Sequence, residues 1–120
     1  MNTPALETDL RALQLLAQQP KLNQRELASE LGVSLGKVNY CLKALLAKGF
    51  LKAQNFKNSK NKLAYAYVLT PAGIAARAEL TAEFLQVKLV EYQRLTEQIA
   101  MLREQAIVES GHAQSKGSEA

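Results

Sequence analysis

The fold of this 120-residue chain is decided by one stretch, Gln24-Arg25-Glu26-Leu27-Ala28-Ser29-Glu30-Leu31-Gly32-Val33-Ser34. Asn23 precedes the stretch, and the Asn23 to Glu26 spacing is that of a capping box at a helix start. Gly32 stands where helices commonly end in a left-handed residue. Ser34 then suits the cap of a further helix. The stretch therefore predicts a short helix, a tight turn and a second helix.

The helix that follows Ser34 has two different faces and is expected to end at Gly49. Its apolar stripe comprises Leu35, Val38, Leu42 and Leu45, with Leu46 alongside. The opposite face comprises Gly36, Lys37, Tyr40, Lys43, Ala44 and Ala47, with Asn39 at its margin. We expect the small Ala28 to lie where the two helices cross, and Val38 to pack inward.

The segments on either side complete the pattern. Apolar residues recur at helical spacing before Pro20, beginning with Leu6, Leu10 and Leu13, and Thr3-Pro4 suits the start of that helix. The ranges 50–56 and 63–69 are expected to be strands, because apolar and aromatic residues alternate imperfectly in them. Three lysines lie in the connection 57–62, which predicts a hairpin with a basic tip.

A long helix is expected to begin at Thr70-Pro71, with Thr as cap and Pro in the first turn. Neither Pro nor Gly occurs from Ile74 to Ser110, which allows a helix of about 38 residues and about 57 Å. An early apolar stripe comprises Ile74, Ala78, Leu80 and Phe84. A later heptad seam comprises Leu85, Tyr92, Leu95, Ile99 and Leu102, with Lys88 as a polar break.

Composition supports a helical protein that binds rather than catalyses. The chain contains 20 Leu and 18 Ala but 6 Val and 3 Ile, which favours helix and nearly excludes an all-β sandwich. One Cys and one His exclude an internal disulfide and a Cys-rich zinc site, and the six Gly form no phosphate loop. No apolar run approaches the roughly 20 residues needed to span a bilayer, and the N-terminus has no pattern of a secretory signal. We expect a cytoplasmic protein with no enzyme activity, catalytic residue, metal or cofactor.

Charge is distributed unevenly along the chain. The net charge is +4, but residues 1–70 carry 10 Lys/Arg and 4 Asp/Glu, whereas residues 71–120 carry 5 and 7. No acidic residue occurs between Glu30 and Glu79. An ordinary solvated surface mixes both signs, so the acid-free range indicates a phosphate-binding surface, with a solvated basic face as the alternative.

Together these features predict a mainly α fold with a small β-hairpin. The order helix, helix, helix, hairpin and long helix is that of a winged helix-turn-helix domain followed by a long C-terminal dimerisation helix. We assign residues 4–70 to the DNA-binding domain and 71–109 to the dimerisation helix. Residues 110–120 are small and polar and are expected to be a disordered tail.

The chain resembles the MarR-type winged helix-turn-helix transcription regulators, in particular the short exopolysaccharide-associated bacterial members. The resemblance covers roughly residues 5–105 and is carried by Gln24 to Ser34, Val38 to Leu45, Lys48 to Leu51, Asn55 to Lys60 and Tyr67-Val68-Leu69-Thr70-Pro71-Ala72-Gly73. It implies sequence-specific DNA binding by a homodimer and control of transcription. Larger members have long elements at both ends that build the dimer and a ligand pocket. Here the N-terminal element is short and one C-terminal helix remains, so a small-molecule effector stays an open question.

The expected partner is double-stranded DNA, because the start of the second helix of such a motif enters the major groove. Lys37 and Asn39 are candidates for base edges, and Tyr40 and Lys43 for phosphates. The hairpin lysines would follow the backbone or the minor groove. The candidate DNA-binding residues are Gln24, Arg25, Ser34, Leu35, Gly36, Lys37, Asn39, Tyr40, Lys43, Lys57, Asn58, Lys60, Asn61 and Lys62.

Other interpretations remain open at this point. A protein-interaction module would use the winged domain as a scaffold and the long helix as a coiled-coil partner for another protein. RNA binding has less support, because few exposed aromatics are available for base stacking. Cys41 is expected to be a half-buried small hydrophobe, with redox sensing as the alternative. His112 has no assigned role.

Overall fold

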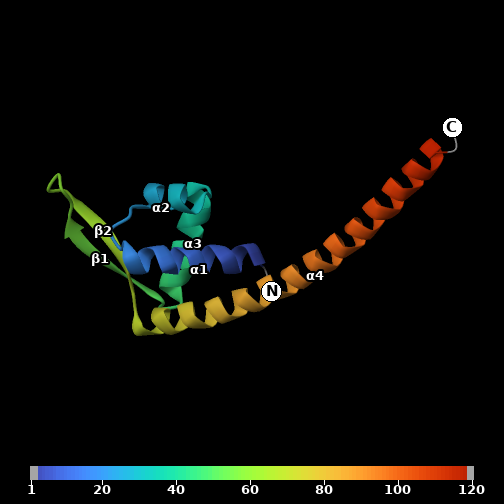
Figure 1. The fold of residues 1–120 in the computed structure, drawn as a ribbon. Helices are drawn as coiled ribbons and strands as arrows, with labels where there is room; N and C mark the ends of the chain where they lie inside the picture. Colours follow the sequence, from blue (N-terminus) through green and yellow to red (C-terminus); the bar gives the residue numbers. More distant parts are fainter. Residues whose placement is uncertain (1–2, 119–120) are drawn as a thin grey trace. The chain divides into compact units, whose positions relative to one another are not determined.

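The computed structural model describes residues 3–118 as four helices and one hairpin (Figure 1). The elements are α1 (Thr3–Gln18), α2 (Gln24–Leu31), α3 (Leu35–Ala47), β1 (Leu51–Lys57), β2 (Leu63–Leu69) and α4 (Pro71–Ser118). This confirms the predicted class, mainly α with a small hairpin and a long C-terminal helix. The chain divides into two compact units, Met1–Phe84 and Leu85–Ala120.

Helix α2 begins and ends with the caps that its sequence predicts. The Asn23 side chain accepts a hydrogen bond from the Glu26 amide at 2.7 Å, and the Glu26 carboxylate accepts one from the Asn23 amide at 3.1 Å. Gly32 ends the helix with a φ of 68°, in the left-handed region that favours glycine. The Arg11 guanidinium of α1 donates to the carbonyl oxygens of Leu31 and Glu30, at 3.0 and 3.3 Å, and so satisfies two carbonyls at the helix end.

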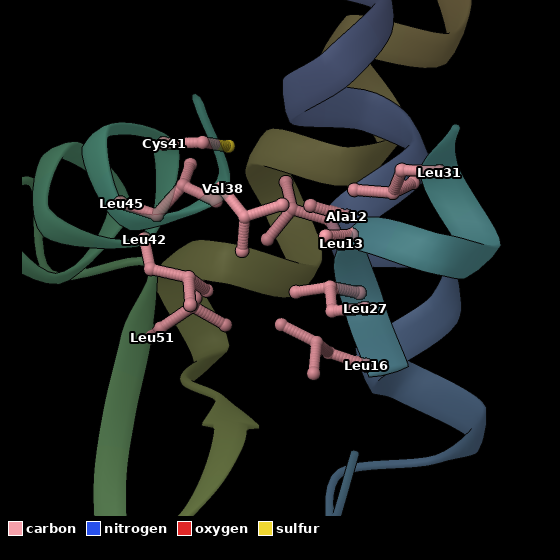
Figure 2. Close-up of a cluster of buried hydrophobic side chains, with 11 residues drawn as sticks. Ala12, Leu13, Leu16, Leu27, Leu31, Val38, Cys41, Leu42, Leu45 and Leu51 are labelled. Carbon is pink, nitrogen blue, oxygen red and sulfur yellow. The ribbon is translucent and has the colours of Figure 1, made fainter. Parts of the chain in front are cut away.

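Three helices and the first strand share one hydrophobic core. Figure 2 shows side chains of α1, α2, α3 and β1 pointing toward one another. Its members are Ala12, Leu13, Leu16, Leu27, Ala28, Leu31, Val38, Cys41, Leu42, Leu45 and Leu51. The predicted positions of Ala28 and Val38 in this core are confirmed.

One residue of the predicted stripe of α3 is not in the core. Leu35 is 42% exposed, although the helical spacing placed it with Val38 and Leu42. The buried residues of α3 begin at Val38, so the first turn of the helix extends beyond the packed layer. Periodicity alone predicts the face of a residue but not the point along the helix at which packing begins.

The hairpin is antiparallel and is held at its base. Leu51 pairs with Leu69 at the base, and Lys57 pairs with Leu63 beside the tip. On the outer edge of β2, the Tyr67 amide donates to the Pro20 carbonyl at 2.9 Å. This bond connects the hairpin to the segment between α1 and α2.

The start of α4 is joined to the end of α3 through a compact junction. The Thr70 hydroxyl caps α4 by accepting from the Gly73 amide at 3.0 Å, and it also donates to the Gly49 carbonyl. The Phe50 carbonyl accepts from the Thr70 amide at 3.1 Å and lies directly against Gly73. The Thr-Pro-x-Gly sequence is thus explained by a cap and by a close backbone approach.

The packing face of early α4 differs from the predicted one. Ala76 is buried and Leu80 packs against the core, whereas Ile74 is 54% exposed and Ala78 is also exposed. The contact between Gly73 and Phe50 sets the rotation of the helix, which turns Ala76 and Leu80 inward. The apolar stripe expected from the sequence thus included the exposed Ile74 and Ala78 and left out the buried Ala76, whereas Leu80 and Phe84 are half-buried as part of it.

The later part of α4 is one continuous helix with exposed apolar side chains. The helix continues to Ser118, so the tail predicted for 110–120 is helical over 110–118, while residues 119 and 120 lie outside the described range. Small and polar residues such as Ala and Gln are compatible with helix when no Pro follows. The predicted boundary at 70/71 coincides with the start of α4, whereas the compact units divide inside this helix.

Candidate nucleic-acid interface

The start of α3 presents bare backbone and polar groups to solvent. A Cβ atom built on Gly36 would meet nothing within 4 Å, so the helix surface is open there. Lys37 and Lys43 are exposed, and Tyr40 is 78% exposed. Ser34 caps the helix by accepting from the Lys37 amide at 3.1 Å. This surface can approach a flat or grooved partner without rearrangement of the helix.

Two of the candidate side chains have partners inside the protein. The Asn39 amide group donates to the Gln24 side-chain carbonyl at 3.2 Å, and the Gln24 amide group donates to the Tyr67 hydroxyl at 3.3 Å. Asn39 and Gln24 are half-buried, whereas Arg25 beside Gln24 is exposed. Their prediction as DNA contacts stays a prediction, but both side chains are already used within the fold.

The hairpin tip brings the predicted basic groups together. Lys57, Lys60 and Lys62 are exposed, as is Asn61. Asn58 has a different position, because its side chain accepts from the amides of Lys60 and Lys62 at 3.0 Å each. Asn61 has a φ of 61°, a conformation that Asn adopts more readily than most residues. The two asparagines therefore shape the turn that displays the lysines.

Three further residues near this surface were not predicted. Lys21 is exposed, with its ammonium 5.1 Å from the centre of the Phe56 ring. Leu63 and Tyr65 of β2 are 72% and 61% exposed, on the face of the hairpin that also carries Tyr67. The alternation of β2 could have identified this pair, whereas the approach of Lys21 to the hairpin depends on tertiary structure.

The electrostatic character of the surface follows from the acid-free range. No Asp or Glu occurs in α3, β1, β2 or their connections. Glu26, on the neighbouring α2, is engaged in the capping box. The exposed lysines on α3 and at the hairpin tip therefore give this surface a positive character, which favours an anion of extended shape.

Cys41 is in the core and not on this surface. It is 5% exposed, and its thiol donates to the Asp9 carboxylate at 3.2 Å. Burial, together with the hydrogen bond and negative charge of Asp9, raises the pKa of the Cys41 thiol from 9.0 to about 12. A protonated, buried thiol is a poor nucleophile, so the structure favours the packing role over redox sensing.

The Cys41 environment gives a pH dependence with a definite sign. Because the pKa is higher in the folded state, this thiol stabilises the protein fully below about pH 9, and the contribution is lost as the pH rises toward 12. We expect the stability difference between the wild type and Cys41→Ala to shrink steadily as the pH rises through that range, because the wild type loses the contribution of the protonated thiol. Urea denaturation at several alkaline pH values measures it, and parallel pH profiles of the two proteins would contradict it.

Comparison with known proteins identifies the motif. Residues 6–52 match the family model described as winged helix-turn-helix DNA-binding. The matched residues comprise most of α1, all of α2 and α3, and the first two residues of β1. With the β1–β2 hairpin that follows, they have the order of a winged helix-turn-helix, in which α3 has the place of the recognition helix and the hairpin that of the wing. A comparison with curated proteins finds no match.

Solved structures similar to this winged helix-turn-helix chain include MarR-family regulators. The adhesin competence repressor AdcR of Streptococcus pyogenes is 26% identical, with a TM-score of 0.53 over 76% of this chain and 60% of that one. ZitR of Lactococcus lactis, a zinc-responsive MarR family member, is 24% identical, with a TM-score of 0.53 over 76% and 60%. MepR, a transcription regulator of the Staphylococcus aureus multidrug efflux pump MepA, is 20% identical, with a TM-score of 0.52 over 85% and 74%.

These similarities confirm the winged helix-turn-helix fold that the sequence predicted, and the similar solved structures include a MarR family member. The chain spans 60% of the AdcR and ZitR structures, which are longer proteins. The proteins named are regulators rather than enzymes, in agreement with the predicted lack of catalytic activity. Within residues 3–118, no helix has both the length and the apolar character needed to cross a membrane. The same residues contain no group of three or more His, Cys, Asp or Glu that could hold a metal ion.

Proposed function

We propose that this chain is a MarR-type transcription regulator that binds a pseudo-palindromic DNA operator as a homodimer. The observation that carries the proposal is the exposed, acid-free surface formed by the start of α3 and the wing. This surface belongs to a winged helix-turn-helix fold, and solved structures with a similar fold include transcription regulators. Membership of the short exopolysaccharide-associated subgroup and a cytoplasmic, nucleoid-associated location belong to the same proposal.

The proposed mechanism divides the contacts into two kinds. The first turns of α3 enter the major groove, where the open backbone at Gly36 permits close approach and Lys37 reaches guanine edges. Tyr40, Lys43 and Arg25 bind phosphates, with Arg25 assisted by the positive end of α2. The wing lysines bind the flanking backbone and supply affinity that depends on salt.

Dimerisation is assigned to the later part of α4. Leu85, Tyr92 and Leu95 are 54%, 70% and 54% exposed, and Ile99 and Leu102 are 41% and 62% exposed. These five residues follow a heptad spacing, which is typical of a helix that pairs with another helix. A two-fold dimer would present two recognition helices to two half-sites. We propose residues 4–70 as the DNA-binding part and 71–109 as the dimerisation helix.

Selection of bound DNA from a random pool tests the proposal directly. The full chain is expected to enrich sequences with two related half-sites, and Lys37→Ala and Lys60→Ala are expected to weaken binding to them. The salt dependence should also fall by about one phosphate contact for Lys60→Ala. A stable dimer that enriches no DNA would instead support the protein-interaction module.

The dimer seam has its own test. We expect Leu95→Asp combined with Ile99→Asp to convert the dimer to a monomer, because each replacement places a charge in an apolar helix interface. Sedimentation equilibrium measures the mass, and operator affinity should fall with it. Gln93→Asp is the matched control, since Gln93 is exposed and lies off the seam. A seam variant that keeps the mass of the wild-type protein would exclude this interface.

A further inference from the structure

Three polar side chains from three separate elements meet between the recognition helix and the wing. Gln24 is the first residue of α2, Asn39 lies within α3 and Tyr67 lies in β2. Gln24 accepts from the Asn39 side chain at 3.2 Å and donates to the Tyr67 hydroxyl at 3.3 Å. The Gln24 side chain thus bridges α3 and β2. Within residues 3–118, no side-chain hydrogen bond joins these two elements directly.

The bridge is attached close to the base of the wing. Tyr67 pairs with Ala53, and its backbone amide donates to the Pro20 carbonyl at 2.9 Å. The wing strand is therefore bonded to the helical part through both its backbone and its tyrosine hydroxyl at one residue. The lysine-bearing tip lies further out, beyond the Lys57 to Leu63 pair. A small rotation at Tyr67 becomes a larger displacement at the tip.

The same bond restricts what Asn39 can do on DNA. Reading adenine requires the Asn amide to donate and accept at a single base edge. Asn39 is half-buried, and its amide already donates to Gln24, so turning toward a base would break the bridge. The hydrogen bond to Gln24 and contact with a base therefore exclude one another, and in the structure Asn39 makes the bond to Gln24.

We propose that Gln24, Asn39 and Tyr67 are a positioning network that fixes the wing relative to the recognition helix, and that Asn39 acts through Gln24 rather than on a base. The network fixes the distance between the residues of α3 that contact the groove and the wing residues that contact phosphates before DNA binds. Binding then requires less ordering of the wing. This inference rests on the proposed function, because its consequence is DNA affinity.

A double-mutant cycle on the full chain tests the network, with the DNA enriched from the random pool as the probe. Asn39→Ala and Tyr67→Phe are each expected to weaken binding by about two- to tenfold, the range for loss of one hydrogen bond. The double variant should bind DNA about as well as the single variant with the lower affinity, because either change alone already interrupts the bridge through Gln24. Repeating the selection with Asn39→Ala should give the same preferred bases as the wild type.

Three results of the binding experiments would overturn the proposal. Additive losses in the double variant would show that the residues act independently. A relaxed preference at one base position with Asn39→Ala, absent with Tyr67→Phe, would identify Asn39 as a base-reading residue. If the wild-type chain enriches no DNA, the proposed function fails, whereas normal wild-type binding with unaffected variants rejects the network alone.

A measurement without DNA separates positioning from folding. Tyr67→Phe should accelerate hydrogen exchange of the Tyr67 backbone amide and the wing amides, while the amides of the α1 and α3 core keep their wild-type rates. Tyr65→Phe removes the same group from an exposed residue of the same strand and should leave the wing unchanged. Unchanged wing exchange in Tyr67→Phe, or faster exchange throughout the core, would contradict a local positioning role.

Discussion

We expect a triple variant with alanine at Lys57, Lys60 and Lys62 to bind DNA with a weaker salt dependence. The slope of log affinity against log salt concentration should fall by the equivalent of about three phosphate contacts. The three side chains are exposed at the wing tip, and no carboxylate lies in the hairpin. Each lysine that meets a phosphate releases counterions, so its loss weakens binding to all sequences in a similar way. Titrations of labelled operator at several salt concentrations measure the slope.

Arg94→Ala is the control for this experiment. It also removes a positive charge, but from the Leu85–Ala120 unit, which contains none of the candidate DNA-binding residues. The control should keep the wild-type slope. If the triple variant keeps both the slope and the affinity of the wild type, the wing lysines do not bind phosphates and serve only to discourage aggregation at the strand edge.

Two glycines should respond to alanine in opposite ways. The Cβ atom of Gly73→Ala would overlap the Phe50 carbonyl oxygen, so the junction of α3 and α4 must shift. We expect a loss of about 1–3 kcal/mol or more in the free energy of unfolding. Gly36→Ala has open space around the new methyl group and replaces a helical glycine, so stability should rise by about 0.5–1 kcal/mol.

DNA affinity distinguishes the roles of the same two positions. Gly36→Ala should bind operator about tenfold more weakly, equivalent to ~1.4 kcal/mol, because the methyl group intervenes between α3 and the groove. Thermal unfolding gives the stability of each variant, and titration with operator DNA gives its affinity. A Gly36→Ala protein with unchanged affinity would remove this residue from the interface, and a stable Gly73→Ala protein would show that the junction adjusts freely.

Much of the fold could be predicted from the sequence because local signals determine helix ends. The capping box at Asn23, the left-handed Gly32 and the Ser34 cap each depend on neighbouring residues, and all three are present in the structure. The hairpin was predicted nearly to the residue, since a change from helical to alternating spacing is also local. The basic surface was predictable as well, because charges accumulate along one continuous range.

The remaining differences arise from tertiary contacts. Whether Asn39 faces solvent or Gln24 depends on the angle between α2, α3 and β2, which no spacing of residues encodes. The choice of Ala76 over Ile74 as the buried residue of α4 depends on the backbone approach at Gly73. Lys21 lies over the Phe56 ring and follows Pro20, whose carbonyl accepts a hydrogen bond from the Tyr67 amide of the wing, so this contact also depends on how the chain packs in three dimensions.

The hydrogen bond between Thr70 and Phe50 has a consequence for how such a protein can change. The chain enters the hairpin at Phe50 and leaves it at Thr70, and the two residues are joined by a bond of 3.1 Å. Insertions or deletions at the tip therefore leave the entry and exit points in place, and the closure entropy of a loop grows slowly with its length. The hairpin can therefore be lengthened or shortened at its tip while the helical core stays the same, and in the proposed DNA complex such a change would alter how far the wing reaches.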